Sequence, residues 1–551
     1  QKMKITKIKS FPVWGGNRNF FFVKVETDAG IYGIGEGGIT WRELAAAACV
    51  DHLKPLLIGE DPSQIEHLWQ LMFRGGFFPA GRIACSAISA IDIALWDIRG
   101  KVLGVPVYDL LGGLVRKKVV SYPHIGGESP EQLANNAIKM ADQGWRFVRW
   151  GTPTEGDILE PSKAARQTLK QCDAVRTALG DDIEILIDVH TRLDPQHVIP
   201  LCRSLEQFHP YFIEDPLRSE NVKTYHQMAR HVSVPLAVGE QFATKWEFRE
   251  LIEEELMQYA RIDVCIVGGL TEARKVANWC ETHYIDIAPH NPLGPVSTAA
   301  CLHLDLATSN FGVQELPRQP GTILPEVFPV QVALEDGHLL PPTSPGLGVY
   351  FNVRESGQSN VYHANLKGNV KKITKGNHML TMNDMVGADA VGTWSDPSNP
   401  SDIISNSTKK SNNINQLTKV NEDIFYNVEF GEVEEVTYES VDGKKVQGWI
   451  VKPPGFDLNK KYPLVLRIHG GPHSMYNVGF NYNFQLHAAQ DQVVLYTNPR
   501  GSTGYGYDFA NAIQNAYPGN DYDDIMAGVD EVISRGSVSY THLTLPTSDL
   551  V

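Results

Sequence analysis

The sequence predicts an α/β protein whose central part is a (β/α) barrel. Between about Val119 and Leu316, short apolar runs alternate with amphipathic stretches of helical length, the pattern of repeated parallel βαβ units. Polar residues follow successive runs at a nearly constant step, as expected for strands that end at one rim. The 551 residues are enough for about three domains at ~100–200 residues each.

An α+β region, residues 1–118, is expected before the barrel. Residues 4–13 and 20–27 alternate like strands, and the turn signal Asp28-Ala29-Gly30 ends the second of them. Apolar residues at helical spacing predict a helix over 84–103.

The barrel is expected to occupy residues 119–318, followed by a return to the first region over 319–352 that includes a strand pair within 331–340. The apolar runs that predict its strands are Phe147-Val148, Ile183–Ile187, Tyr211–Ile213, Leu236–Val238, Ile262–Val267, Ile285–Ala288 and Phe311–Val313.

The sequence changes character after residue 352. Residues 353–430 predict a loop-rich β region, with a polar stretch rich in Ser, Asn and Asp at 396–421. Residues 431–537 predict the start of a second α/β domain, and the tail 538–551 fits neither part. Its predicted strands are 435–439, 446–451, 464–468 and 493–496, and its predicted helices are 507–516 and 522–534.

Composition excludes several classes of protein. The net charge of −15 argues against a nucleic-acid partner, because phosphate binding needs clustered basic residues. Without an apolar run of about 18 residues or an N-terminal apolar segment, neither a membrane partner nor a secretory signal is expected. Seven cysteines without a CxxC predict reduced thiols in a cytoplasmic protein. Because the chain begins with Gln1, we expect a fragment or a start at Met3.

Six polar residues form a ladder along the barrel, with steps of 26, 26, 23, 27 and 25 residues. Such steps match one βα unit, so successive strands are expected to deliver these side chains to the carboxyl-terminal rim, where active sites of this fold lie. The ladder consists of Asp188, Glu214, Glu240, Asp263, His290 and Glu315.

The residue types in the ladder predict metal-assisted proton transfer. Asp188, Glu214 and Glu240 would repel one another without a hard cation, and oxygen ligands of this kind suit one Mg²⁺ ion. Asp263 beside His290 would orient the imidazole as a general base. Glu315, if protonated, would hydrogen-bond a developing oxyanion, and His190 is a second candidate acid or base.

Several segments resemble the enolase superfamily, in its mandelate racemase subgroup, over about residues 1–352. They are Ile187-Asp188-Val189-His190, Phe212-Ile213-Glu214-Asp215-Pro216, Val238-Gly239-Glu240-Gln241, Arg261-Ile262-Asp263, Gly268-Gly269-Leu270-Thr271-Glu272, Ala288–Pro295, Gln314-Glu315 and the helix 87–97. The resemblance implies a capping domain over a modified TIM barrel, and abstraction by the enzyme of the proton α to a carboxylate with Mg²⁺ as cofactor.

Within this superfamily, the details resemble the galactonate and mannonate dehydratases. Many relatives carry a Lys-x-Lys base where this chain has Arg149 and Gly151, which argues against two-base racemisation. By analogy, His290 abstracts the C2 proton, His190 protonates the departing C3 hydroxyl and Glu315 assists the enediolate. The expected activity is a hydro-lyase that converts a galactonate-type sugar acid to a 2-keto-3-deoxy acid. A racemase, epimerase or cycloisomerase on the same scaffold is the alternative.

Substrate contacts are expected from the capping-domain loops and the first two barrel strands. Arginine pairs with carboxylates and aromatic side chains exclude water. The candidates are Trp14, Arg18, Arg82, His124 and Arg149. The resemblance also implies a homo-oligomer.

The second part resembles prolyl oligopeptidase-family serine peptidases, with a partial β-propeller at 353–430 and a truncated α/β-hydrolase fragment at 431–537. The segments that carry the likeness include His469-Gly470-Gly471-Pro472 and 498–506. The Gly-x-Ser-x-Gly motif that such a peptidase needs is absent from the sequence, so we expect no peptidase activity. The tail resembles a translated sequencing adaptor, which predicts a chimeric chain joined near 353–360.

Overall fold

The computed structural model describes two compact units that meet in the sequence near residue 350. The described residues are 3–16, 18–154, 159–325, 327–349, 354–360, 362–364, 370–372, 374–386, 389–407, 414–470, 473–514 and 516–539. The predicted junction at 353–360 lies partly outside them, and the predicted tail lies outside them from residue 540 onward.

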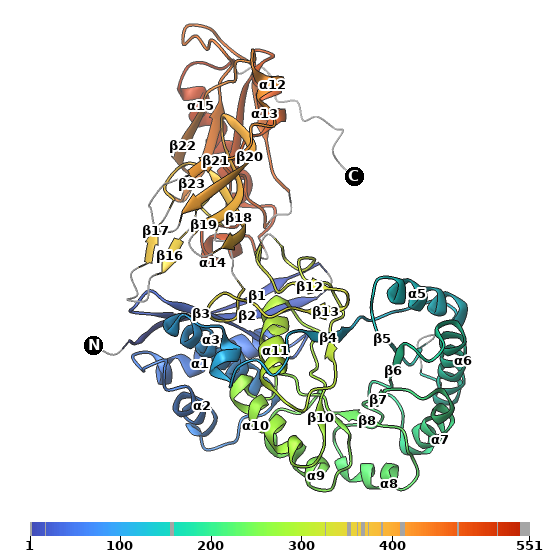
Figure 1. Ribbon diagram of the computed structural model, residues 1–551. Helices are drawn as coiled ribbons and strands as arrows, with labels where there is room; N and C mark the ends of the chain where they lie inside the picture. Colours follow the sequence, from blue (N-terminus) through green and yellow to red (C-terminus); the bar gives the residue numbers. More distant parts are fainter. Residues whose placement is uncertain are drawn as a thin grey trace. The chain divides into compact units, whose positions relative to one another are not determined.

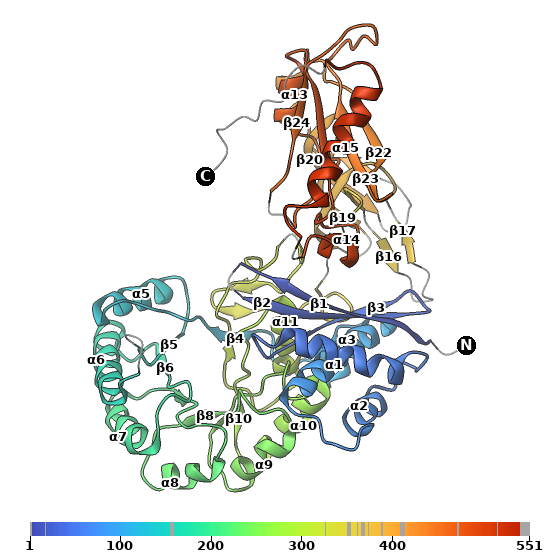
Figure 2. The same ribbon diagram turned by 180° about the vertical axis from the view of Figure 1, so that it is seen from behind.

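The first unit begins with an antiparallel sheet in the order β1-β2-β3, on which α3 packs (Figures 1 and 2). The helix approaches β3 closely because the strand carries glycines there; a Cβ atom at Gly35 would lie 1.7 Å from the carbonyl oxygen of Ala90. The elements are β1 (Ile5–Trp14), β2 (Asn19–Thr27), β3 (Tyr32–Gly37), α1 (Glu43–Leu57), α2 (Ile65–Arg74), α3 (Arg82–Leu103) and α4 (Val107–Leu110). The predicted strands and long helix of this region are present with ends shifted by one or two residues.

Parallel strands alternating with helices follow, as the sequence predicts. The strands of this region form two sheets. One has six strands in the order β10-β9-β8-β7-β6-β5, and the other has four strands in the order β11-β4-β13-β12. Single parallel bridges, His124 to Arg149 and Ile287 to Phe311, join the two sheets, so the ladders do not run continuously around the predicted barrel.

The strands of this region are β4 (Val119–Tyr122), β5 (Phe147–Gly151), β6 (Glu184–Asp188), β7 (Phe212–Glu214), β8 (Leu236–Val238), β9 (Tyr259–Ala260), β10 (Asp286–Ile287), β11 (Gln314–Glu315), β12 (Leu334–Glu335) and β13 (His338–Leu339). The helices are α5 (Pro130–Asp142), α6 (Pro161–Leu179), α7 (Pro195–Leu205), α8 (Tyr225–Ala229), α9 (Lys245–Glu253), α10 (Gly269–Glu281) and α11 (Pro295–Ala307).

Two predicted strands are wrong in position. The predicted strand 262–267 is a turn that leads into α10, and the strand itself is β9 at Tyr259–Ala260. Its apolar residues Ile262, Val264 and Val267 are buried although they form no strand, and Ile266 packs against the core of the α+β region. Similarly, the run 311–313 precedes β11 and contributes a single bridge.

Two buried carboxylates connect the α+β region to the barrel. Glu36 on β3 accepts hydrogen bonds from the backbone N–H groups of Gly294 (2.7 Å) and Ser297 (2.8 Å), where α11 begins. Asp92 on α3 accepts from the backbone N–H of Thr271 (3.0 Å) on α10. Burial raises the pKa of Glu36 to about 8 and that of Asp92 to about 7. These contacts hold the capping region over the loops that follow β9 and β10.

His303 on α11 predicts an acid-sensitive step in the stability of this unit. Its ring is fully buried and its Nδ1 accepts from the backbone N–H of Tyr108 (3.0 Å), and burial lowers its pKa to about 4. The neutral ring therefore stabilises the fold above the unfolded pKa of about 6.5, and this stability is lost as pH falls. The control His303→Gln keeps a hydrogen-bond acceptor but does not titrate. When the pH is lowered from 7 to 5, the free energy of unfolding measured by urea denaturation should fall by about 2 kcal/mol more for the wild type than for His303→Gln. Parallel curves for the two proteins would contradict this.

The second unit contains two larger sheets, and β16 pairs with β17 in a separate two-stranded sheet. One of the larger sheets has the order β14-β15-β18-β19-β20-β21, and the other has the order β22-β23-β25-β24, with α15 packed on it. The polar stretch 396–421 of the predicted loop-rich β region holds two strands of the first sheet, and Asp402, Ile404 and Asn406 are buried at alternate positions of one of them. The predicted propeller and hydrolase origins stay predictions.

The strands of this unit are β14 (Arg354–Glu355), β15 (Gln358–Ser359), β16 (Tyr362–Ala364), β17 (Val370–Lys372), β18 (Met379–Val386), β19 (Asp389–Asp396), β20 (Asn399–Ser407), β21 (Ile414–Gln416), β22 (Val433–Glu439), β23 (Lys445–Val451), β24 (Leu464–Arg467) and β25 (Val493–Asn498). The helices are α12 (Glu422–Phe425), α13 (Tyr482–Ala488), α14 (Tyr507–Asn511) and α15 (Asn520–Ser534). Across the described parts of the chain, no helix has the length and apolar character needed to cross a membrane.

Candidate active site

The ladder residues lie at the carboxyl ends of successive parallel strands. Asp188 ends β6 and Glu214 ends β7, and the two are register partners. Glu240 lies two residues after β8, and Glu315 ends β11. Asp263 and His290 follow β9 and β10 in the same way.

His290 and Asp263 form a hydrogen-bonded pair. The distance from His290 Nδ1 to Asp263 Oδ2 is 2.8 Å, and the other ring nitrogen, Nε2, lies 3.5 Å from Glu240 Oε2. Burial alone would lower the pKa of His290, but the carboxylates of Glu240, Glu315 and Asp263 raise it to about 9. The carboxylate fixes the ring, and Nε2 is left to face the centre of the site.

Arg261 is a residue of the site that sequence reasoning quoted in a motif without giving it a role. Its side chain is fully buried, with Nη2 2.7 Å from Glu214 Oε1 and 2.6 Å from Glu315 Oε2. Its cation therefore compensates two carboxylates of the ladder. The sequence alone gives no signal that sets this arginine apart. It is recognised as a site residue only by its position between Glu214 and Glu315.

Arg149, predicted to bind substrate, is engaged by protein carboxylates. It forms ion pairs with Asp188 and, at 3.3 Å, with Glu214. His124, also predicted to bind substrate, lies beside it, and its Nε2 is 2.7 Å from Glu315 Oε1. Burial and the nearby Arg149 lower the pKa of His124. The first two barrel strands thus contribute to the charge balance of the site.

The carboxylates gather into a group that differs by one residue from the predicted metal ligands. Among the described residues, oxygens of Glu214, Asp215 and Glu240 lie within 4.8 Å of one another, and all three residues are buried. Asp188 is not in this group. Asp215 was missed because it directly follows Glu214, and adjacent strand residues normally point to opposite faces; here Asp215 has a φ of 39°, which takes it out of the strand.

The charge distribution of this group fits a hard cation. Burial, followed by Glu214 and Asp188, raises the pKa of Asp215 to about 7, and burial raises that of Glu240 well above its usual range. Asp188 Oδ1, Asp215 Oδ2 and Glu240 Oε2 are buried and have no hydrogen-bond donor within the described residues. Buried carboxylate oxygens without donors are the ligands that Mg²⁺ prefers.

His190, the second candidate acid or base, contacts the ladder residue Asp188. Its Nδ1 lies 2.9 Å from Asp188 Oδ2, and this hydrogen bond raises its pKa. The backbone of His190 has a φ of 56°, so the strand has already turned at this residue. About half of the side chain is exposed, so the ring is accessible from the open side of the site.

Glu315 has the environment of an ionised acceptor. Besides Arg261 and His124, the backbone N–H of Asn291 donates to it at 2.8 Å. Burial favours the neutral acid, but Arg261 and His290 outweigh it and hold the pKa of Glu315 well below its usual range. These donors do not fit the protonated, donating Glu315 that the sequence suggested.

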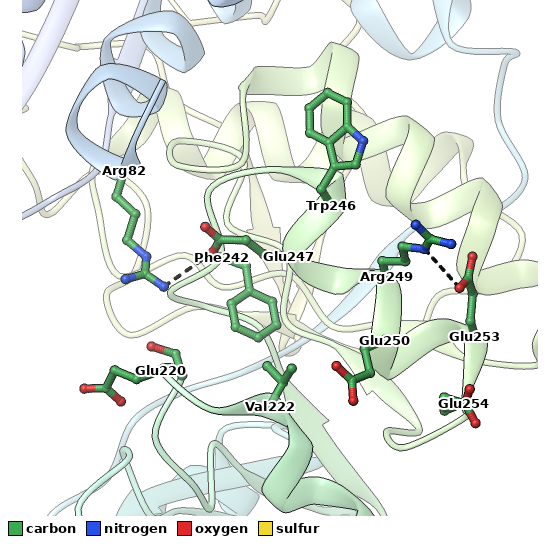
Figure 3. Close-up of a pocket in the computed structure, with 11 residues that line it drawn as sticks. Arg82, Glu220, Val222, Phe242, Trp246, Glu247, Arg249, Glu250, Glu253 and Glu254 are labelled. Atoms are coloured by element: carbon green, nitrogen blue, oxygen red, sulfur yellow. Dashed lines mark hydrogen bonds and ion pairs between the residues drawn. The ribbon is translucent and has the colours of Figure 1, made fainter. Parts of the chain in front are cut away.

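The three predicted capping-region contacts have different environments. Trp14 ends β1 and is largely exposed, whereas Arg18 donates to the carbonyl oxygen of Pro292 at 2.6 Å. Arg82 donates to the carbonyl oxygen of Gln241 (2.7 Å) and pairs with Glu247 (3.4 Å) beside a cavity of about 530 Å³ (Figure 3). That cavity is lined by none of the ladder residues, and five of its eleven lining residues are glutamates.

Comparison with known proteins matches both halves of the first unit. Residues 15–112 match the mandelate racemase/muconate lactonizing enzyme N-terminal domain, and residues 132–356 match the enolase C-terminal domain-like family. Residues 478–545 match the prolyl oligopeptidase family.

Curated relatives and solved structures match the same region. A D-galactonate dehydratase from Ralstonia pickettii is 38% identical over 356 residues, which is 63% of this chain and 92% of the relative. A D-mannonate dehydratase from Caulobacter vibrioides is 38% identical over 361 residues, 60% of this chain and 89% of the relative. A crystal structure of an enolase from Pantoea ananatis with bound D-gluconate and Mg is 31% identical, with a TM-score of 0.61 over 64% of this chain and 93% of that one.

The chain therefore belongs to the enolase superfamily, with the mandelate racemase/muconate lactonizing enzyme type of domains. Its homologues are galactonate and mannonate dehydratases, and the first unit is a sugar-acid dehydratase of this superfamily.

Proposed function

We propose that this enzyme catalyses the Mg²⁺-dependent dehydration of a galactonate-type sugar acid to a 2-keto-3-deoxy acid. The observation that carries the proposal is the His290–Asp263 pair, whose Nε2 faces buried carboxylates suited to a divalent cation. The names of the dehydratase relatives support the same reaction class.

The proposed steps use two histidines. His290 Nε2 takes the proton from C2, and the electron pair of the broken C–H bond moves into the carboxylate to form an enediolate. His190 gives a proton to the C3 hydroxyl, the C3–O bond breaks and water leaves. The resulting enol takes up a proton at C3 as its C2 hydroxyl loses one, which yields the ketone.

The remaining residues hold charge and orientation. Asp188, Glu214 and Glu240 would hold the metal ion, with Asp215 beside Glu240 as a further candidate ligand. When bound, Mg²⁺ would stabilise negative charge on the substrate carboxylate. Asp263 keeps the His290 ring in place, and Arg261 forms ion pairs with both Glu214 and Glu315.

Isomerisation on the same scaffold is the second candidate function. It would need a base on the opposite face of the substrate, at the second barrel strand. Arg149 lies there in ion pairs with Asp188 and Glu214, and a guanidinium in this setting does not accept a proton.

A product assay on the full chain tests the proposal. The protein is incubated with Mg²⁺ and each member of a library of acid sugars, and 2-keto-3-deoxy acids are detected by their colour reaction. D-galactonate should give a coloured product, and a chelator should abolish the reaction. A product of unchanged mass would support the isomerase instead. Failure of every acid to lose its α-proton would reject both.

A further inference from the structure

Two arginines share one acceptor in the loop that follows His290. Arg18 Nη1 lies 2.6 Å, and Arg318 Nη1 3.3 Å, from the carbonyl oxygen of Pro292. Pro292 is two residues after His290, in the loop between β10 and α11. Arg18 reaches this loop from the turn between β1 and β2, and Arg318 comes from the segment that follows β11. The pair is thus assembled from three segments that are distant in sequence.

The pair lacks a carboxylate partner, unlike the three arginines in and beside the candidate active site that are described above. Arg149 and Arg261 are each paired with two carboxylates, and Arg82 is paired with Glu247. Within the described residues, neither Arg18 nor Arg318 has a carboxylate at ion-pair distance. Burial and the neighbouring Arg18 lower the pKa of Arg318, as expected for a half-buried cation beside a like charge.

Two adjacent guanidinium groups without carboxylates are a ready site for an oxyanion. Each guanidinium has five N–H donors, and one contact to a carbonyl leaves most of them free. Carboxylates and phosphates accept such donors in pairs. A bound anion would also remove the repulsion between the two cations. Both side chains are half-buried, so they remain open to a ligand.

We propose that Arg18 and Arg318 form a clamp for a second anionic group, at the end of the substrate opposite to the reacting carboxylate. This inference rests on the proposed function, in which the metal site holds the reacting carboxylate. It narrows the substrate from a simple aldonate to a galacto-configured acid whose far end carries a carboxylate, as in galactarate, or a phosphate, as in galactonate 6-phosphate.

The test compares three acids that share the configuration at C2 to C5: galactonate, galactarate and galactonate 6-phosphate. The full chain with Mg²⁺ should prefer one of the doubly anionic acids over galactonate in kcat/KM, and which one it prefers identifies the terminal group. Arg318→Met should raise KM for that acid by about 10- to 100-fold, the effect of losing a charged hydrogen bond, while KM for galactonate changes little. Arg249→Met, which removes a surface arginine on α9 paired with Glu253, is the control and should change neither.

Three results would overturn the clamp. Galactonate could be the preferred substrate, Arg318→Met could raise KM equally for all three acids, or the control could behave like the variant. Calorimetric titration of both doubly anionic acids separates this inference from the proposed function. Suppose that no acid is dehydrated. The clamp is still supported if one doubly anionic acid binds more tightly to the wild type than to Arg318→Met. It is refuted if each of the two acids binds equally tightly to the two proteins.

Discussion

Replacing the two candidate catalytic histidines should separate proton abstraction from loss of water. His290→Asn is expected to reduce both dehydration and exchange of the α-proton into D₂O by about 10²–10⁴-fold, the usual contribution of a general base. His190→Asn should reduce dehydration by a similar factor but leave exchange close to wild type, because Asp263 still orients an intact His290. The measurements are product formation and loss of the C2 proton signal by NMR.

The control for this pair is His226→Asn. His226 also contacts a carboxylate, with Nε2 3.0 Å from Glu250 Oε1, but it lies on α8 outside the site. It should alter neither rate. Exchange that survives in His290→Asn would refute the assignment of the base, and exchange lost in His190→Asn would show that this residue also affects the first step.

Glu240→Gln should lower the affinity for Mg²⁺ while leaving the metal-free protein as stable as wild type, or more stable. Glu240 is buried near Asp215, Glu214 and Asp188, and burial together with these charges disfavours its ionised form. The neutral amide avoids the repulsion that an ionised Glu240 meets in the metal-free protein, but it is a poorer metal ligand than the carboxylate. We expect affinity to fall by more than about 100-fold, beyond the 10- to 100-fold typical of residues that only support ligands. Calorimetry measures the affinity, and melting in the presence of a chelator measures stability.

Glu272→Gln is the control, and it should change the two measured quantities in the opposite way: stability should fall and the affinity for Mg²⁺ should not. Glu272 is equally buried, but it is neutralised by Lys245 (2.7 Å) and Lys275 (2.8 Å). The substitution leaves Lys245 without a carboxylate partner and Lys275 with Glu66 alone, so the variant should melt earlier and bind Mg²⁺ normally. A Glu240→Gln protein that binds Mg²⁺ like wild type would remove this residue from the metal site.

Local patterns in the sequence predicted most of the elements of the first unit. Alternating apolar residues located β1 and β2, and helical spacing located α3, because each signal depends only on neighbouring residues. The same logic misplaced the strand at 262–267. There Ile266 packs against the core of the α+β region, and periodicity does not say which surface buries a residue.

The sequence by itself determined that six polar residues recur at the period of one βα unit, because parallel strands that end at one rim impose that spacing. From these six residues, the sequence also predicted that carboxylates and a histidine form a proton-transfer site. Only the tertiary structure decided how their charges are balanced: Arg261 between Glu214 and Glu315, Arg149 on Asp188, and Asp215 turned toward Glu240. Those contacts join positions tens of residues apart, and Coulomb interactions depend on distance in space, which spacing along a chain does not specify.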